Sequence, residues 1–280
     1  MATLTYTTAG TTGFDMRTLD FDALLQGRPV AAFNPFIVQW KDPAAPSTEY
    51  LAVLGDDLAP TVAGGTLTGL TGTRITSVFV FDPIFGIGFQ GMDISVDTFF
   101  NALQAKDWSG LARLVRQGDD RIVGTANADV LMGGDGNDVF VGGLGRDRIN
   151  GGRGDDTLEA TEGRDVLTGG AGADTFAFEA PPEDGFLPVI TDFRHGVDRI
   201  AVEDIVFNHV GNGGFTGAPL DAIHFGYGKQ AKTPEQGLIY DKVKGLLFYD
   251  PDGSDPAGSR ILVAKLGAGT NLTFDDFWVV

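Results

Sequence analysis

The chain has 280 residues, of which 42% are hydrophobic, so it can bury a sizeable core in one to three domains. Its formal net charge is −18, with 20 Lys and Arg against 38 Asp and Glu. This charge argues against a nucleic-acid partner, because phosphate binding needs clustered Lys and Arg. The 41 glycines predict many tight turns, and the lack of cysteine excludes disulfides. No apolar run approaches the roughly 20 residues that a transmembrane helix requires.

Residues 1–114 are predicted to form an N-terminal α+β module. Short β-branched and aromatic runs, separated by Gly, Pro and Asp, predict antiparallel strands at Ile37–Trp40, Tyr50–Leu54, Gly65–Leu70 and Ile75–Phe81. Apolar residues at helical spacing predict helices over Met16–Gln26 and Ser95–Gln117, the second with Ser95 as its N-cap. We expect the second helix to cover the open end of the repeat that follows.

Six nonapeptides follow one another between Gly124 and Ala177: GTANADVLM, GGDGNDVFV, GGLGRDRIN, GGRGDDTLE, ATEGRDVLT and GGAGADTFA. Position six is always Asp, at Asp129, Asp138, Asp147, Asp156, Asp165 and Asp174. Position eight is always large and apolar, at Leu131, Phe140, Ile149, Leu158, Leu167 and Phe176. A degenerate block with Asp120 and Ile122 in the same register precedes them, so the repeat region is predicted to span residues 115–177.

The period predicts a parallel β-roll. Six Gly-rich residues make a turn and three make a short strand, and one apolar residue per strand forms a core only when strands stack. Two nonapeptides then make one coil of a right-handed solenoid, so that turns two blocks apart lie on the same side. A flexible Gly/Asp linker is the alternative, but a linker would not keep an apolar residue at one phase through six blocks.

Each side of such a roll gathers carbonyl and carboxylate oxygens, the hard ligands that Ca²⁺ prefers. Without a cation the stacked carboxylates repel one another, and ordering a Gly-rich chain costs much entropy. We therefore expect folding to be coupled to calcium binding, in the weak range of about 10⁻⁴–10⁻³ M that is usual for extracellular calcium modules.

The blocks resemble the GGxGxDxUx nonapeptide of the RTX (repeats-in-toxin) family, a calcium-binding β-roll and the standard example of this repeat. The resemblance implies that one turn contributes the carbonyls of positions two and four and its Asp. The turn two blocks later contributes the carbonyls of positions one and three and its Asp.

The resemblance thus implies four or five calcium ions, each held by ligands from two turns of the same side. The five implied ligand sets are Gly134, Gly136, Asp138, Gly151, Arg153 and Asp156; Gly152, Gly154, Asp156, Gly169, Ala171 and Asp174; Gly143, Gly145, Asp147, Ala160, Glu162 and Asp165; Thr125, Asn127, Asp129, Gly142, Leu144 and Asp147; and, as the weakest, Gly118, Asp120, Gly133, Asp135 and Asp138. Because the blocks at Gly124 and Ala160 lack canonical glycines, their sites are expected to be weaker or distorted.

Residues 178–280 are predicted to form a β-rich cap, with strands at Val189–Ile190, Arg199–Val202, Leu238–Tyr240, Leu246–Tyr249 and Arg260–Leu266. The stretches VITDFRHGVDRI, LIYDKVKGLLFYDPDGSD and LTFDDFWVV resemble the region after the β-roll in serralysin-type RTX proteins. That resemblance implies a cap on the roll and an uncleaved signal for type I secretion machinery. The chain would leave the cell unfolded and fold outside it without a signal peptide or disulfide, as an extracellular protein that is either free or held at the cell surface.

No enzymatic centre is evident in the sequence. There is no HExxH zinc motif and no GxSxG motif, and the three histidines, at 195, 209 and 224, follow the repeat. We therefore expect a non-enzymatic surface, matrix or self-assembling protein. The alternatives are a carboxylate-based hydrolase in residues 1–114, or a carbohydrate-binding module there that uses Trp40 and Tyr50. Asp192, Asp198, Asp250, Asp252 and Asp255 are alternative ligands for a further ion, although the favoured interpretation is that they are turn residues.

Overall fold

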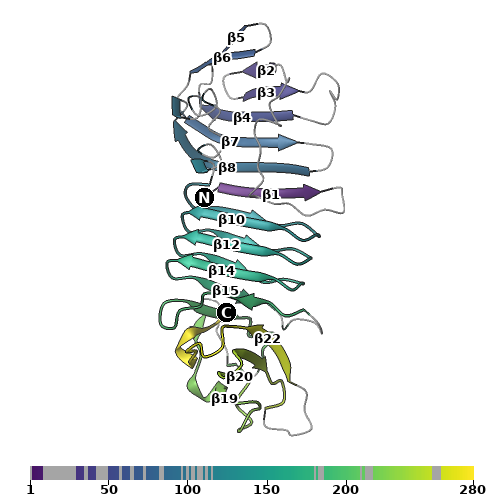
Figure 1. The fold of residues 1–280 in the computed structure, drawn as a ribbon, viewed down its shortest axis with the longest axis vertical. Helices are drawn as coiled ribbons and strands as arrows, with labels where there is room; N and C mark the ends of the chain where they lie inside the picture. Colours follow the sequence, from purple (N-terminus) through teal and green to yellow (C-terminus); the bar gives the residue numbers. More distant parts are fainter. Residues whose placement is uncertain are drawn as a thin grey trace.

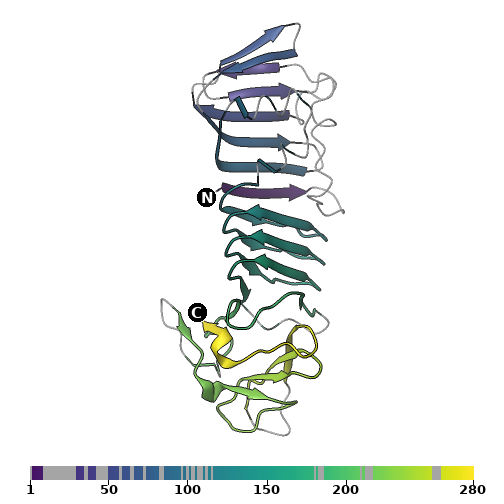
Figure 2. The ribbon, with the colours of Figure 1, turned by 60° about the vertical axis from the view of Figure 1, so that its left-hand side comes forward.

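The computed structural model describes residues 116–179, 181, 186–208, 210–211, 217–253 and 260–280 with their side chains. Before residue 116 it describes the backbone of the strands named below and a few positions between 95 and 114. The molecule is long and narrow, with strands stacked along its axis and the repeat at the middle (Figures 1 and 2). Both chain ends lie beside the roll rather than at the tips of the molecule.

The repeat folds into two facing columns of short parallel strands. One sheet contains β9 (Asp120–Val123), β11 (Val139–Val141), β13 (Thr157–Glu159) and β15 (Thr175–Phe178). The other contains β10 (Val130–Asp135), β12 (Arg148–Arg153) and β14 (Val166–Ala171). Strands pair with a shift of two blocks, as in the pairs Leu131–Ile149 and Phe140–Leu158. The predicted β-roll, with one coil per two nonapeptides, is confirmed.

The core of the roll is made by position eight. All six of its side chains, together with Ile122, are at most 1% exposed. They form one ladder of Leu131, Ile149 and Leu167 and a second of Ile122, Phe140, Leu158 and Phe176. Each strand contributes a single apolar side chain, so the core exists only because the strands stack.

The N-terminal part continues one of these sheets as an antiparallel sheet. Its strands are β1 (Ala2–Thr8), β2 (Val30–Asn34), β3 (Ile37–Lys41), β4 (Tyr50–Asp56), β7 (Arg74–Phe81) and β8 (Phe85–Ser95), with a separate hairpin of β5 (Ala59–Ala63) and β6 (Thr66–Thr71). The four predicted strands correspond to β3, β4, β6 and β7. Strand β1 pairs in parallel with β9 and antiparallel with β8, so it covers the first edge of the roll in this sheet.

The predicted helices are described only in part. The segment Met16–Gln26 lies outside the described residues. Within Ser95–Gln117, six of the described positions are helical, and the backbone N–H of Thr98 donates to Oγ of Ser95 at 3.2 Å, which confirms the N-cap. No helix in the described portion of the chain is long and apolar enough to cross a membrane.

The C-terminal part extends both sheets of the roll. Strands β17 (Arg199–Val202) and β23 (Phe277–Val279) add to one sheet, whereas β16 (Val189–Ile190) and β22 (Ile261–Lys265) add to the other. Antiparallel β21 (Leu246–Tyr249) and β20 (Leu238–Asp241), followed by β19 (Phe225–Tyr227), complete the second sheet. The remaining elements are β18 (Ala218–Pro219) and the 3₁₀ helices η3 (Ala222–His224) and η4 (Phe274–Asp276). All five strands predicted here are present.

Candidate calcium sites

The position-six aspartates stand in two columns, one at each end of the short strands. Turns that lead from β10 to β11, β12 to β13 and β14 to β15 form the first turn column, with Asp138, Asp156 and Asp174. Turns from β9 to β10, β11 to β12 and β13 to β14 form the second, with Asp129, Asp147 and Asp165. Asp120, from the degenerate block, precedes Asp138 in the first column. The sequence-predicted carboxylates are therefore brought together in the two sets expected from the period.

In five of these aspartates, one carboxylate oxygen links two turns. In the first column, Oδ1 of Asp138 accepts the backbone N–H of Asp120 at 2.8 Å, Asp156 that of Asp138 at 2.8 Å, and Asp174 that of Asp156 at 3.1 Å. The second column repeats the pattern: Asp147 accepts from Asp129 at 2.8 Å and Asp165 from Asp147 at 3.0 Å. These bonds hold the side chains in one orientation through the stack.

The other carboxylate oxygen is buried and has no hydrogen-bond partner among the described residues. This applies to Oδ2 of Asp138, Asp147, Asp156, Asp165 and Asp174, and to Oδ1 of Asp120. The side chains themselves are at most 3% exposed. A buried carboxylate oxygen without a donor is costly unless a cation compensates it, so each of these oxygens fits a metal ion.

The electrostatics agree with the orphaned oxygens. Burial raises the pKa of Asp120, Asp138 and Asp156 to about 7 and that of Asp147 to about 8, with further increases from neighbouring carboxylates. Burial also raises the pKa of Asp165 and Asp174. The raised pKa values mean that burial disfavours the ionised carboxylates, and a bound cation would stabilise that ionised form.

The glycines at positions two and four adopt a backbone conformation that other residues rarely take. Gly134 and Gly136 have φ of 121° and 131°, and the equivalent glycines of the later canonical blocks are also in the positive-φ region. Side chains at these positions would be strained, whatever the space around them. The turn therefore depends on Gly at positions two and four to present its carbonyl groups on one side.

The position-one glycines leave room for an ion. A Cβ added at Gly133 would clash with Oδ2 of Asp138 and would lie 2.5 Å from the carbonyl oxygen of Gly151. A Cβ added at Gly151 would likewise clash with Oδ2 of Asp156 and would lie 2.7 Å from the carbonyl oxygen of Gly169. A carboxylate from one turn and a position-one carbonyl from the next turn of the column thus converge on the same small space, as the implied ligand sets require.

The position-three carbonyls take part in the stack as well. The carbonyl of Arg153 accepts the N–H of Gly136 at 2.8 Å, and that of Ala171 accepts the N–H of Gly154 at 2.7 Å. A carbonyl oxygen has two lone pairs, so each of these can accept one hydrogen bond and still coordinate an ion.

The two non-canonical blocks differ from the others in their contacts. In the block at Gly124, Oδ2 of Asp129 accepts the N–H of Thr125 at 2.6 Å and the Thr125 hydroxyl at 3.0 Å, so this oxygen is satisfied within its own turn. In the block at Ala160, the Thr161 hydroxyl donates to the carbonyl of Gly143, one of the implied ligands. These contacts give a physical reason to expect weaker sites in the second column.

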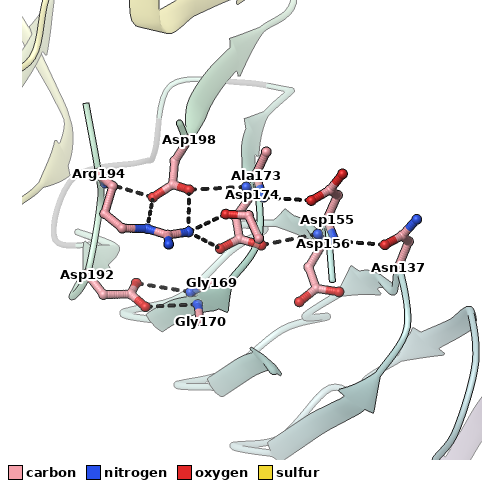
Figure 3. Close-up of polar contacts among 11 residues, drawn as sticks. Asn137, Asp155, Asp156, Gly169, Gly170, Ala173, Asp174, Asp192, Arg194 and Asp198 are labelled. Carbon is pink, nitrogen blue, oxygen red and sulfur yellow. Dashed lines mark hydrogen bonds and ion pairs between the residues drawn. The ribbon is translucent and has the colours of Figure 1, made fainter. Parts of the chain in front are cut away.

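A second ladder, at position five, was not found from the sequence. Oδ1 of Asp119 accepts the N–H of Asn137 at 2.8 Å, Oδ1 of Asn137 that of Asp155 at 2.7 Å, and Oδ1 of Asp155 that of Ala173 at 2.7 Å (Figure 3 shows its later members). The sequence could have indicated this ladder, because Asp119, Asn137 and Asp155 place an oxygen-bearing side chain at position five of alternate blocks. This outer ladder ties the turns of the first column together without facing the orphaned oxygens.

Other acidic groups do not assemble a comparable site. Among the described residues, no three His, Asp or Glu side chains gather as a metal cluster, whereas the ligand sets implied for the roll consist mainly of backbone carbonyls. Asp250 is buried, its Oδ1 has no hydrogen-bond partner, and burial together with a hydrogen bond to Asp252 raises its pKa. Asp255 and His209 lie outside the described part of the chain.

A match to a family model agrees with this geometry. The model of the RTX calcium-binding nonapeptide repeat (4 copies) matches residues 116–149 and 150–180. No curated protein matches the chain. Among solved structures, the chain is similar to the AlgE6R3 subunit of the mannuronan C5-epimerase from Azotobacter vinelandii, with 24% identity, 58% of this chain and 78% of that chain covered, and a TM-score of 0.23. Residues 116–180 therefore carry RTX calcium-binding nonapeptide repeats, which form the β-roll at the centre of this chain.

Proposed function

We propose that this chain is an exported, non-enzymatic protein whose β-roll folds when it binds four or five calcium ions outside the cell. The observation that carries this proposal is the set of orphaned carboxylate oxygens, which are buried, aligned and without donors. Folded without a cation, the roll keeps five carboxylate oxygens away from water with no compensating group, and a sixth, Oδ2 of Asp174, has only the Arg194 guanidinium at 3.5 Å. Calcium removes that cost only in the folded state, so its binding free energy becomes folding free energy.

The proposed division of labour follows the sequence. Residues 115–177 bind calcium through the five implied ligand sets, residues 1–114 cap the first coil, and residues 178–280 cap the last and carry the type I secretion signal. In the folded chain, Asp276 and Phe277 are 2% and 1% exposed, so machinery that recognises these two side chains must meet them before folding. This supports export of an unfolded chain in low calcium, followed by folding in the calcium-rich medium.

The test is a calcium titration of the purified full chain from a chelated start, followed by far-UV circular dichroism with light scattering alongside. We expect a cooperative gain of β-structure that is lost when chelator is added. Scattering that rises with the β-signal would assign a self-assembling role, and unchanged scattering a monomeric one. A fully β-structured chain in chelator that ignores calcium would exclude calcium-coupled folding.

Export is tested separately. The full chain is co-expressed with a type I secretion apparatus and compared with a chain that lacks residues 272–280. We expect the full chain in the medium and the shortened chain in the cells. Equal export of both would place the signal elsewhere.

A further inference from the structure

The loop after the last repeat closes the first turn column (Figure 3). This loop, residues 191–198, departs from the nonapeptide sequence, and Asp198 follows Asp174 by 24 residues rather than 18. Nevertheless, Oδ1 of Asp198 accepts the backbone N–H of Asp174 at 3.2 Å, the same bond that joins the aspartates of the repeat. Asp198 is 3% exposed and therefore stands as the next member of the position-six ladder.

A guanidinium group lies between these last two carboxylates. Nη2 of Arg194 is 2.9 Å from Oδ1 of Asp198 and 3.5 Å from Oδ2 of Asp174, and it also donates to the carbonyl of Gly172. Nε and the backbone N–H of Arg194 donate to Oδ2 of Asp198 at 3.3 and 2.7 Å. Figure 3 shows the guanidinium directed from the loop into the space between the two turns.

The three groups that Arg194 contacts correspond to three of the six ligand types proposed for each calcium. Gly172 is position four and Asp174 position six of one turn, and Asp198 takes position six of the next. The equivalent groups one turn earlier are Gly154, Asp156 and Asp174, which belong to a proposed calcium site. The guanidinium thus occupies the place that a calcium ion would take if the column continued.

The same loop also satisfies the backbone donors of the last turn. Oδ1 of Asp192 accepts the N–H of Gly169 at 3.0 Å, and its Oδ2 accepts the N–H of Gly170 at 2.9 Å. The next strand pairs with β14 only at Val189 and Ile190, so it supplies no carbonyl groups at these glycines. One acidic side chain therefore replaces the missing acceptors, and one basic side chain replaces the missing cation.

We infer that Arg194 is a built-in cation that fills the last position of the first turn column, so that this end of the roll closes without metal. This inference rests on the proposed calcium sites. Arginine suits the position because its charge does not titrate and its planar fork reaches several oxygens at once. The second column differs, because Pro188 stands where the next aspartate after Asp165 would be, so a cation there would lack a second carboxylate.

The inference predicts that Arg194→Ala creates a calcium site. The full-length variant is compared with the unmodified chain in saturating calcium, and bound calcium per chain is counted by equilibrium dialysis with metal analysis. We expect one additional ion in the variant. Arg148→Ala, which removes the same charge from an exposed strand position, should bind the same number of ions as the unmodified chain. The double variant Arg194→Ala with Asp198→Asn should lose the additional ion.

The outcomes separate this inference from the proposed function. Calcium bound by the unmodified chain tests the proposed function, whereas the difference between Arg194→Ala and the unmodified chain tests the role of Arg194. Arg194→Gln, which keeps hydrogen-bonding capacity without charge, provides a second measurement if the alanine variant does not fold. An unchanged ion count in a folded Arg194 variant would overturn the inference, even if the unmodified chain binds four or five ions.

Discussion

The carboxylate of Asp156 joins two turns of the roll: its Oδ1 accepts the backbone N–H of Asp138 at 2.8 Å, and its Oδ2 is buried without a hydrogen-bond partner. The first oxygen orders the stack, and the second faces the space beside Gly151 where the carbonyl of Gly169 also points. The Asp156 side chain therefore has two roles, ordering the stack and offering an oxygen to a cation, and only the first is fulfilled by the protein alone.

Asp156→Asn should separate these tasks. The amide oxygen can still accept the bond from Asp138, but the charge shared by two proposed calcium sites is lost. We expect the calcium midpoint of folding to rise about tenfold, equivalent to roughly 1.4 kcal/mol, in a titration followed by circular dichroism. Asp155→Asn removes one charge at the exposed neighbouring residue, keeps an acceptor for the N–H of Ala173, and should leave the midpoint nearly unchanged. Equal shifts in both variants would indicate a general charge effect.

The pKa values predict opposite pH dependences with and without calcium. Without calcium, the folded chain binds protons more tightly than the unfolded chain, because burial raises the pKa of Asp138 and Asp156 to about 7 and that of Asp147 to about 8, from an ordinary value of 3.8. Stability is therefore highest below the ordinary value and is lost as the pH rises through the folded values. With calcium bound the carboxylates must be ionised, so acidification should instead release the ions.

Urea denaturation at several pH values, in chelator and in saturating calcium, tests this prediction. In chelator, the midpoint should be higher at about pH 5 than at about pH 8, and in calcium the order should reverse. Asp147→Asn removes the group with the highest of these pKa values. In chelator, the urea midpoint of this variant should therefore fall less steeply at the upper end of the pH range. A calcium-free midpoint that rises with pH would contradict the assignment of buried, uncompensated carboxylates.

The repeat was predictable from the sequence because its period is strict. Position eight recurs every nine residues, which fixed both the buried ladder from Leu131 to Phe176 and the shift of two blocks between paired strands. The strands of the C-terminal part, such as Arg199–Val202, could be found from their composition. Their role as further strands of the two roll sheets could not be predicted, because the loops between them have no common length.

The features that the sequence did not predict all depend on contacts between distant or irregular segments. Strand β1 pairs with β9, far along the chain, and the Thr-rich sequence of residues 2–8 carries no sign of its partner. Arg194 reaches the column only because a loop of irregular length places Asp198 in register with Asp174. The internal hydrogen bonds of Thr125 with Asp129 depend on a turn that lacks the usual glycines.

Gly133→Ala tests the space that the proposed ion would occupy. The added methyl group would meet Oδ2 of Asp138 and the carbonyl of Gly151, and Gly133 is not in the positive-φ region, so backbone strain plays little part. We expect a loss of about 1–3 kcal/mol in unfolding free energy from overpacking, with one calcium fewer per chain. Gly269→Ala provides the control, because Gly269 has a φ of 84° and open space around its Cβ position.

The two glycine variants should differ in ion count rather than in stability. Strain at Gly269 costs about 1–2 kcal/mol, similar to the overpacking at Gly133, yet no proposed ligand lies near it. The Gly269 variant should therefore bind the full number of ions in equilibrium dialysis. If Gly133→Ala also keeps every ion, the space beside Gly133 is not a calcium site.

The C-terminal end of the roll is held by Asp276. Its Oδ1 accepts the N–H of Gly196 at 2.9 Å, its Oδ2 accepts the N–H of Thr273 at 2.7 Å, and both oxygens lie 2.8 Å from Nδ1 of His195. This carboxylate joins 3₁₀ helix η4 to the loop that contains Arg194. Unlike the six roll aspartates that have an oxygen without a hydrogen-bond partner, it has partners for both oxygens, so its contribution to stability should not depend on calcium.

Asp276→Ala should therefore lower the unfolding free energy by about 2–4 kcal/mol, because two backbone donors lose their acceptor, by a similar amount in chelator and in calcium. Urea denaturation in both conditions measures the loss, and equilibrium dialysis should find an unchanged number of calcium ions. Asp275→Ala, at the exposed neighbour, should change stability by less than about 0.5 kcal/mol. A loss seen only in calcium would show that this end of the chain is ordered by the metal ions, and not by its own contacts.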